Sequence, residues 1–240
     1  MEIRPSPPSF DIPRYLSTLP QFSELDAADQ RRLAEGCSLR RLQRGDMVQH
    51  AGAPCEAFHI TVVGQIKLFA LSAEGKEKVV EIVGPSGSFG EAPMFLDQPC
   101  LLSALALTDV LLLDVNRRIL LDEIERNPSI ALCMLAGLSR RLHGMVRDVQ
   151  SYALHSGFHR VIGYLLRESE GLAAQAFTLS LPVSKATVAS RLSLTPEYFS
   201  RVLHELETAR LIAIDRRDIH VLDLARLAVY SPPQQSGAGG

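Results

Sequence analysis

Short runs of aliphatic and β-branched residues, separated by glycines, fill the chain between Cys37 and Asn116 and restrict the folds that it can adopt. The clearest runs read FHITVV at 58–63, QIKLFAL at 65–71 and KVVEIV at 78–83, among glycines at 45, 52, 64, 75, 84, 87 and 90. Strands this short, at such even spacing, are typical of a barrel or jelly roll. Ser72–Gly75 predicts the hairpin turn between the last two runs. Just before the strands, Asp26–Glu35 predicts a short helix with Asp26 as its N-cap.

Length and composition set the broad class of the protein. The 240 residues accommodate one large domain or two small ones, and 46% hydrophobic with 22% charged residues is ordinary for a soluble globular chain. The opening MEIRPSPPSFDIP has no apolar core, which predicts a flexible lead-in and no signal peptide. No apolar run approaches the roughly 20 residues that cross a bilayer. We therefore expect a cytoplasmic protein with no membrane partner.

The cysteines, the net charge and the absence of catalytic motifs argue against several further classes of protein. Cysteines 37, 55, 100 and 133 are widely spaced and form no CxxC pair, which indicates reduced thiols and argues against a structural zinc site. The net charge of −2 gives no global bias toward nucleic acid, although a local basic strip can still bind DNA. The sequence has no nucleophile elbow, P-loop, dinucleotide fingerprint or metal-ligand pair. We expect no enzyme, and a haem or small-molecule enzyme is only a remote alternative.

A long helical segment begins near Asn127 and Pro128, after the predicted strands. Its apolar residues alternate at spacings of three and four, as in a coiled-coil seam, at Leu135, Leu138, Leu142, Met145, Val149 and Tyr152. One interpretation is an amphipathic helix lying on its own domain. The other is a helix that forms a homodimer, and its position after a barrel favours this second interpretation.

The last third of the chain predicts helices at His159–Glu168, Lys185–Leu192 and Pro196–Thr208, followed by a strand hairpin around Asp215–Asp218. The last two helices, joined by Ser193–Thr195, have the dimensions of a helix-turn-helix. The expected fold class is α+β, with a β jelly roll, a dimerisation helix and a winged helix-turn-helix. The expected divisions are a flexible lead-in and N-terminal segment at 1–25, a sensor domain at 26–127, the dimerisation helix at 128–155, a DNA-binding domain at 156–230 and a disordered tail at 231–240.

The helix at 196–208 separates a core face from a polar face. Thr195 is a good N-cap and proline suits the first helical position, while Phe199, Val202, Leu203 and Leu206 recur at helical spacing. Opposite this stripe lie Glu197, Ser200, Arg201 and His204.

The chemistry of that polar face suits base reading in a major groove. Arg201 can donate two hydrogen bonds to guanine, Glu197 can accept one from cytosine, and Ser200 can serve several base edges. The alternative is a Glu197–Arg201 surface ion pair at the i,i+4 spacing. Residues expected to support DNA binding or to contact phosphates are Thr195, His204, Lys185 and, on the wing, Arg216 and Arg217.

These features together resemble the superfamily of the cyclic-AMP receptor protein and the fumarate–nitrate reduction regulator, which are bacterial transcription factors. The resemblance covers nearly the whole chain, and the pattern Glu197-x-x-Ser200-Arg201 is similar to the recognition-helix signature of the fumarate–nitrate branch. It implies a homodimeric activator that works with RNA polymerase and reads an inverted repeat of TTGAT-type half-sites in double-stranded DNA. It also implies that Glu197 and Arg201 contact the G·C pair and Ser200 a neighbouring thymine.

Four blocks look most similar to the dissimilatory nitrate respiration regulators, which sense nitric oxide through haem. They read EGKEK at 74–78, EAPMFLD at 91–97, LSRRLH at 138–143 and HRVIGYLL at 159–166. The resemblance thus implies a nitric-oxide-responsive regulator of nitrate and nitrite respiration.

The sequence also narrows the choice of effector for the sensor domain. Cyclic-nucleotide binders of the superfamily have Gly-Glu followed by an arginine that holds the phosphate; here Gly90-Glu91 is present, but the later position reads Cys100-Leu-Leu-Ser. No arginine occurs between Arg44 and Arg117, so a buried cyclic phosphate would lack its charged partner and cyclic AMP is not expected. No cysteine precedes Cys37, which disfavours the iron–sulfur cluster of the oxygen-sensing branch.

Haem remains as the expected cofactor. Imidazole is its usual axial ligand, and the sensor half offers His50 and His59. The expected effector pocket contains Glu91, His50, His59 and Cys100. His143, His155 and His159 are weaker ligand candidates, for which surface placement is the simpler interpretation. The alternatives are a thiol switch through Cys55 or Cys100, another small molecule, or no effector.

Overall fold

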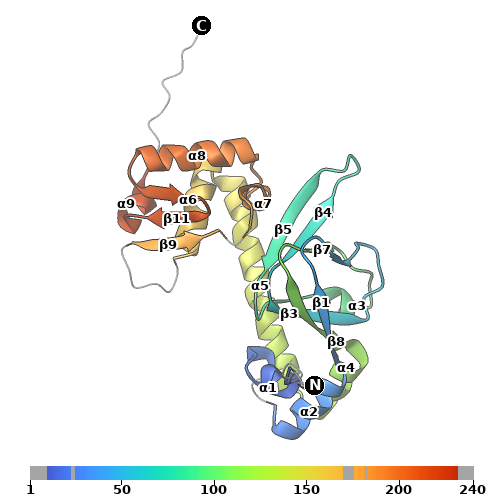
Figure 1. The fold of residues 1–240 in the computed structure, drawn as a ribbon. Helices are drawn as coiled ribbons and strands as arrows, with labels where there is room; N and C mark the ends of the chain where they lie inside the picture. The colour runs from blue at the N-terminus through green and yellow to red at the C-terminus, as the bar shows by residue number, and fades with distance from the viewer. Residues whose placement is uncertain (1–9, 23–24, 170–175, 182, 232–240) are drawn as a thin grey trace, which may run out of the picture. The chain divides into compact units, whose positions relative to one another are not determined.

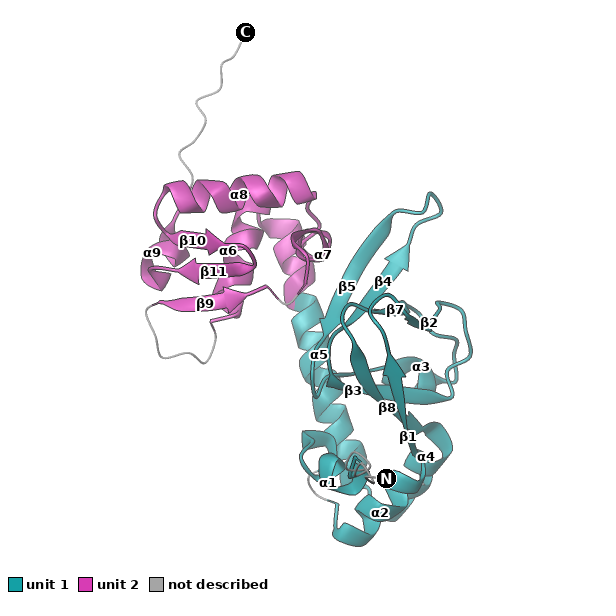
Figure 2. Cartoon of the chain, in the orientation of Figure 1, with its two compact units in different colours: residues 1–146 teal, residues 147–240 magenta. Residues whose placement is uncertain are grey.

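The computed structural model describes residues 10–22, 25–169, 176–181 and 183–231. The chain divides into two compact units, Met1–Val146 and Arg147–Gly240, coloured separately in Figure 2. The predicted fold class is confirmed: a β-sheet domain is followed by a long helix and a C-terminal helix-turn-helix domain (Figure 1). In the described part of the chain, no helix is both long and apolar enough to cross a membrane.

Two antiparallel sheets form the body of unit 1. One has the strand order β1-β8-β3-β6 and the other β2-β7-β4-β5. The strands are β1 (Cys37–Leu42), β2 (Met47–Gln49), β3 (Ala57–Val63), β4 (Ile66–Leu71), β5 (Glu77–Val83), β6 (Ser88–Phe89), β7 (Ser103–Ala106) and β8 (Val110–Asn116). Ile60, Ile66, Leu112 and Leu113 are completely buried, and because Leu112 and Leu113 are consecutive, both faces of β8 are covered. The hairpin predicted at 72–75 joins β4 to β5, and Gly75 has the positive φ of 78° that such a turn favours.

The N-terminal segment is part of this core, and its first helix begins at Ile12, within the last two residues of the stretch MEIRPSPPSFDIP that was predicted to be a flexible lead-in. α1 (Ile12–Ser17), η1 (Pro20–Phe22) and the turn between them bury Leu16, Leu19 and Phe22 completely, and the Phe22 ring lies 6.5 Å from that of Phe58. The short elements gave no repeated helical pattern in the sequence, because only three side chains, three residues apart, are buried. The rest of the predicted lead-in, residues 1–9, lies outside the described residues.

Three further helices complete unit 1. α2 (Ala27–Glu35) has the predicted N-cap, since the Asp26 carboxylate accepts from the amides of Ala28 and Asp29 at 2.8 Å. α3 (Glu91–Leu96) follows β6. α4 (Arg117–Arg126) was not predicted from the sequence; it buries Glu123, whose carboxylate pairs with Arg32 and Arg126.

α5 (Ser129–Leu154) is a single helix of 26 residues and contains the division between the two units. Its first turns bury Ile130 and Met134 in the core of unit 1. The helix predicted to begin near Asn127 and Pro128 is therefore present.

Unit 2 packs helices against a three-stranded antiparallel sheet of order β10-β11-β9. Its elements are α6 (Gly157–Arg167), β9 (Phe177–Ser180), α7 (Lys185–Arg191), α8 (Pro196–Thr208), β10 (Ile212–Asp215), β11 (Asp218–Val221) and α9 (Leu224–Val229). The three predicted helices are present, and α8 has the predicted bounds. β9 and α9 were not predicted. Of the tail expected to be disordered at 231–240, residues 232–240 lie outside the described residues.

Candidate nucleic-acid interface and sensor cavities

The start of α8 is fixed by local chemistry. The Thr195 hydroxyl accepts a hydrogen bond from the Tyr198 amide at 3.2 Å, and Pro196 occupies the first turn, where its missing amide costs nothing. Ser193, in the turn before the helix, has a positive φ of 56°. The stripe expected to face the core is buried: Phe199, Val202, Leu203 and Leu206. The buried stripe therefore fixes the rotation of α8 about its own axis, and with it the side of the helix that faces solvent.

That rotation exposes the polar face. Glu197, Ser200, Arg201 and His204 are all exposed. Among the described residues, no ion pair joins Glu197 to Arg201, so the i,i+4 surface pair is absent. Instead the Arg201 guanidinium carbon lies 4.8 Å from the centre of the Tyr198 ring. The charged groups of this face are thus left available to an external partner.

The hairpin of β10 and β11, which we call the wing, presents two more cations. Arg216 and Arg217 form the tight turn between β10 and β11, and both side chains are exposed. Arg216 has a positive φ of 54°, and the Arg217 carbonyl accepts from the Leu181 amide at 2.8 Å. The predicted support residue Lys185 is half-buried at the start of α7.

The exposed apolar side chains of α5 differ from the predicted seam at two positions. Leu135, Leu142, Met145 and Val149 are exposed as expected, and so are Leu132 and Val146. Leu138 and Tyr152 are half-buried. Leu138 lines cavities in unit 1, and the Tyr152 hydroxyl donates to the Arg191 carbonyl at 2.7 Å within unit 2. The exposed set Leu132, Leu135, Leu142, Val146 and Val149 fits a heptad seam that includes Ser139.

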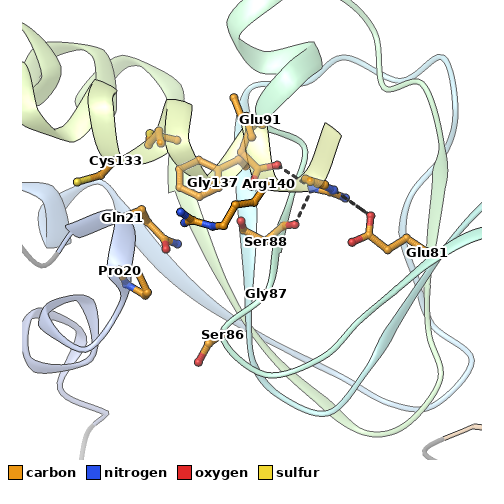
Figure 3. Close-up of a pocket in the computed structure, with 14 residues that line it drawn as sticks. Pro20, Gln21, Glu81, Ser86, Gly87, Ser88, Glu91, Cys133, Gly137 and Arg140 are labelled. Atoms are coloured by element: carbon orange, nitrogen blue, oxygen red, sulfur yellow. Dashed lines mark hydrogen bonds and ion pairs between the residues drawn. The ribbon is translucent and has the colours of Figure 1, made fainter. Parts of the chain in front are cut away.

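A cavity of about 500 Å³, lined by both polar and apolar side chains, lies between α5 and the sheets of unit 1 (Figure 3). Arg141 is one of the lining residues. Its guanidinium donates to Glu81 at 2.6 Å, to the Ser88 carbonyl at 2.9 Å and to Glu91 at 3.4 Å. Glu91 is almost completely buried, so Arg141 provides the charge that a buried carboxylate requires. Arg140 also lines this cavity.

A smaller cavity, of about 220 Å³, shares the wall formed by Glu91, Leu138 and Arg141. We call it the apolar cavity. Its other lining residues are mostly hydrophobic: Gln49, Leu68, Phe89, Gly90, Ala92, Pro93, Leu101, Leu102, Leu142 and Met145. Gln49 donates to the Leu102 carbonyl at 3.1 Å, while its own buried Oε1 accepts no hydrogen bond within the described residues.

The two histidines predicted as haem ligands line neither cavity. His50 is exposed after β2. His59 is buried in β3, with its Nδ1 2.6 Å from the Asp114 carboxylate and its ring 4.9 Å from that of Phe89. Burial alone would raise the pKa of Asp114, but His59 and Arg40 outweigh it and hold that pKa below its usual range.

The predicted effector pocket is therefore not one site. Of its four residues, Glu91 lines both cavities, whereas His50, His59 and Cys100 line neither. The structure instead brings Cys100 beside Cys55, which the sequence separation did not indicate. Burial and the neighbouring Cys100 thiol raise the pKa of Cys55 to about 12. Such a thiol is almost entirely protonated at neutral pH and is a poor nucleophile.

Comparisons with known proteins decide the family. A model of the cyclic nucleotide-binding domain matches residues 39–127, and one of the Crp-like helix-turn-helix domain matches residues 159–230. The solved sensor domain of the transcriptional regulator DNR from Pseudomonas aeruginosa is 30% identical, with 90% of that domain and 56% of this chain aligned at a TM-score of 0.51. The chain belongs to the Crp/Fnr family.

Two other relatives span most of the chain. The CRP-like cAMP-activated global transcriptional regulator of Mycobacterium tuberculosis is 25% identical over 77% of this chain and 84% of its own length. FixK2 from Bradyrhizobium japonicum aligns at a TM-score of 0.71 over 80% of this chain and 95% of its own, at 22% identity, which shows a shared fold alone.

Membership of the Crp/Fnr family fixes the general function. The chain is a Crp-like transcription regulator, not an enzyme, with a sensor domain of the cyclic-nucleotide-binding type and a DNA-binding helix-turn-helix domain. Crp-like regulators bind DNA and typically act as dimers.

Proposed function

We propose that this protein is a homodimeric transcription activator that reads TTGAT-like inverted repeats through α8. The observation that carries the proposal is the exposed edge of Glu197, Ser200 and Arg201 on a helix whose rotation is fixed by a buried stripe. Arg201 would donate to guanine, Glu197 would accept from its cytosine partner, and Ser200 would contact a neighbouring thymine. Activation would further require contact with RNA polymerase.

The neighbouring residues support this assignment. Arg216 and Arg217 at the tip of the wing would contact phosphates, which position the protein without reading sequence. Thr195, Lys185 and His204 would support the same contact from α7 and α8. His204 also lies 3.8 Å from Glu207, so its ring is less available than the arginines.

Dimerisation through α5 would present two copies of α8 to the two half-sites. The exposed leucines and valines of α5 form the largest run of unpartnered apolar side chains on one described helix. Covering such a face removes apolar area from water, which is the main driving force of association. We propose that Leu132, Leu135, Leu142, Met145, Val146 and Val149 contact a second copy of the chain.

The finer assignment, a response to nitric oxide through haem, stays a prediction from the resemblance. The residues named for it fit a haem site poorly. His59 already contacts Asp114 and packs against Phe89, His50 is at the surface, and neither lines a sensor cavity. We therefore assign no step of the response to haem. A thiol switch is also poorly supported, since the pKa of Cys55 is raised to about 12.

A second candidate effector is a small neutral molecule in the apolar cavity. Most of its lining is hydrophobic, and its one cation, Arg141, is already paired with two glutamates. An anionic ligand would have to break those pairs. The unsatisfied Gln49 Oε1 favours an apolar ligand with a single hydrogen-bond donor.

Fluorescence anisotropy with labelled duplexes tests the proposed function. The protein should bind TTGAT-N4-ATCAA more tightly than a duplex in which each G·C pair is exchanged for C·G. Equal affinity for the two duplexes would contradict base reading by α8. Spectra with added haem, with and without nitric oxide, test the effector separately: a Soret shift on nitric oxide addition would restore the haem hypothesis.

A further inference from the structure

The ring of Tyr198 lies against the guanidinium of Arg201, between the residues assigned to base reading. Residues three apart on a helix are neighbours on its surface, and the 4.8 Å separation is within the range of a cation–π contact. Arg201 is exposed, and within the described part of the chain no hydrogen bond or ion pair holds its guanidinium beside this ring contact. Tyr198 is therefore the side chain placed to restrict the conformation of this arginine.

The ring itself is held in place. Tyr198 is half-buried, and its backbone amide is bound by the N-cap Thr195. Gly157, at the start of α6, lies directly against the ring: a Cβ atom there would be 2.8 Å from Tyr198 Cε1 and 2.8 Å from Leu194 Cδ2. Real Cβ atoms essentially never come that close to a neighbour, so only glycine leaves room for this ring position.

The structure assigns to Tyr198 the role of a positioning residue, whose ring holds the Arg201 guanidinium in the orientation needed at the guanine edge. The inference rests on the proposed function of Arg201. A guanidinium stacks through its planar face and donates hydrogen bonds from its edge, so both contacts can exist at once. Arginine otherwise has many rotamers, and DNA binding would have to select one of them at an entropic cost.

The phenol hydroxyl is not part of this role, which gives a matched pair of variants. Tyr198→Phe keeps the ring and its π face, whereas Tyr198→Leu keeps an apolar side chain but removes the ring. The readout is the ratio of dissociation constants for the G·C-swapped duplex and the TTGAT-N4-ATCAA duplex. An exposed cation–π contact corresponds to a two- to five-fold change, so Tyr198→Leu should lower the ratio by about that factor. Tyr198→Phe should leave it unchanged.

A double-mutant cycle with Arg201→Ala separates this role from general damage to unit 2. Tyr198→Leu should have no further effect on the ratio once Arg201 is removed. Binding to unrelated duplex DNA and the thermal unfolding curve monitor folding, and Tyr198→Met serves as a second ring-less variant if the leucine variant is unstable.

Three results would overturn the inference. The ratio could be unchanged in both ring-less variants, it could fall equally in Tyr198→Phe, or it could fall equally with and without Arg201. In each case Arg201→Ala alone still lowers the ratio, so the proposed function stands. If Arg201→Ala itself leaves the ratio unchanged, base reading by Arg201 fails, and the role of Tyr198 fails with it.

Discussion

Shortening Leu135 on α5 should weaken the dimer without changing the fold of the monomer. The Leu135 side chain is 60% exposed in the single chain, so most of its apolar surface is available for burial against a second copy. Complete burial of a leucine is worth about 1.5–3 kcal/mol, and six-tenths of that is about 1–2 kcal/mol for each copy. Because a two-fold interface uses each residue twice, Leu135→Ala should cost about 2–4 kcal/mol. The dimer dissociation constant should then rise roughly 30- to 700-fold.

Sedimentation velocity over a range of concentrations measures this change, and the chain offers a matched control. Leu71, at the end of β4, is also 60% exposed but lies outside α5, so Leu71→Ala removes the same groups from a surface that we do not assign to the dimer. The dissociation constant of this control should match that of the wild type. A dimer unaffected by Leu135→Ala, or weakened equally by Leu71→Ala, would refute the assignment of α5 as the interface.

Three other predictions test single features. Arg216→Ala should weaken binding to all duplexes alike and reduce the slope of log affinity against log salt by about one, as measured by titration at several salt concentrations; a sequence-selective loss would contradict a phosphate contact. Phe22→Ala should cost about 3–5 kcal/mol of stability in chemical denaturation, since its side chain is completely buried, whereas almost no change would show that this segment does not pack on the core. Because the folded-state pKa of Asp114 is lowered, its stabilising effect is present above the ordinary aspartate pKa of about 3.9 and is lost as pH falls through the lower folded-state value. Asp114→Asn should therefore cost about 1.5–3 kcal/mol at neutral pH and flatten the acid side of the stability profile; an unchanged acid side would contradict the role given to this carboxylate.

The helix-turn-helix could be predicted closely from the sequence because its signals are local. A Thr-Pro start and a buried stripe of period 3.6 define α8 without reference to the rest of the chain. The strand runs and their glycines likewise predicted the β-sheet domain. The alternation in β9 involves only four residues, so that strand of the wing carried too little pattern to be recognised.

The sensor site was predicted less well because it depends on contacts between distant segments. Arg141 reaches 60 residues back along the chain to Glu81. The sequence has no arginine between Arg44 and Arg117, and that absence gives no indication that α5 supplies one. In the same way, Cys55 and Cys100 are 45 positions apart in the sequence and adjacent in the fold.

The dimer seam shows a subtler limit. Two sets of apolar residues follow the same three-and-four spacing along α5, and the sequence does not indicate which set faces the core of unit 1. Burial of Met134 and the contacts of Leu138 fix that side, which moves the exposed seam to include Leu132 and Val146. The helix and its periodicity could be read from the sequence, whereas its rotation required the packed structure.

The most direct test of base reading by α8 is selection of preferred duplexes from a pool in which every base pair of the half-site is randomised. The wild-type protein should enrich inverted repeats with a G·C pair at the third position of TTGAT, and Arg201→Ala should lose the preference at that position by about 1–3 kcal/mol while keeping the others. A variant that enriches the same G·C pair as the wild type would contradict the account.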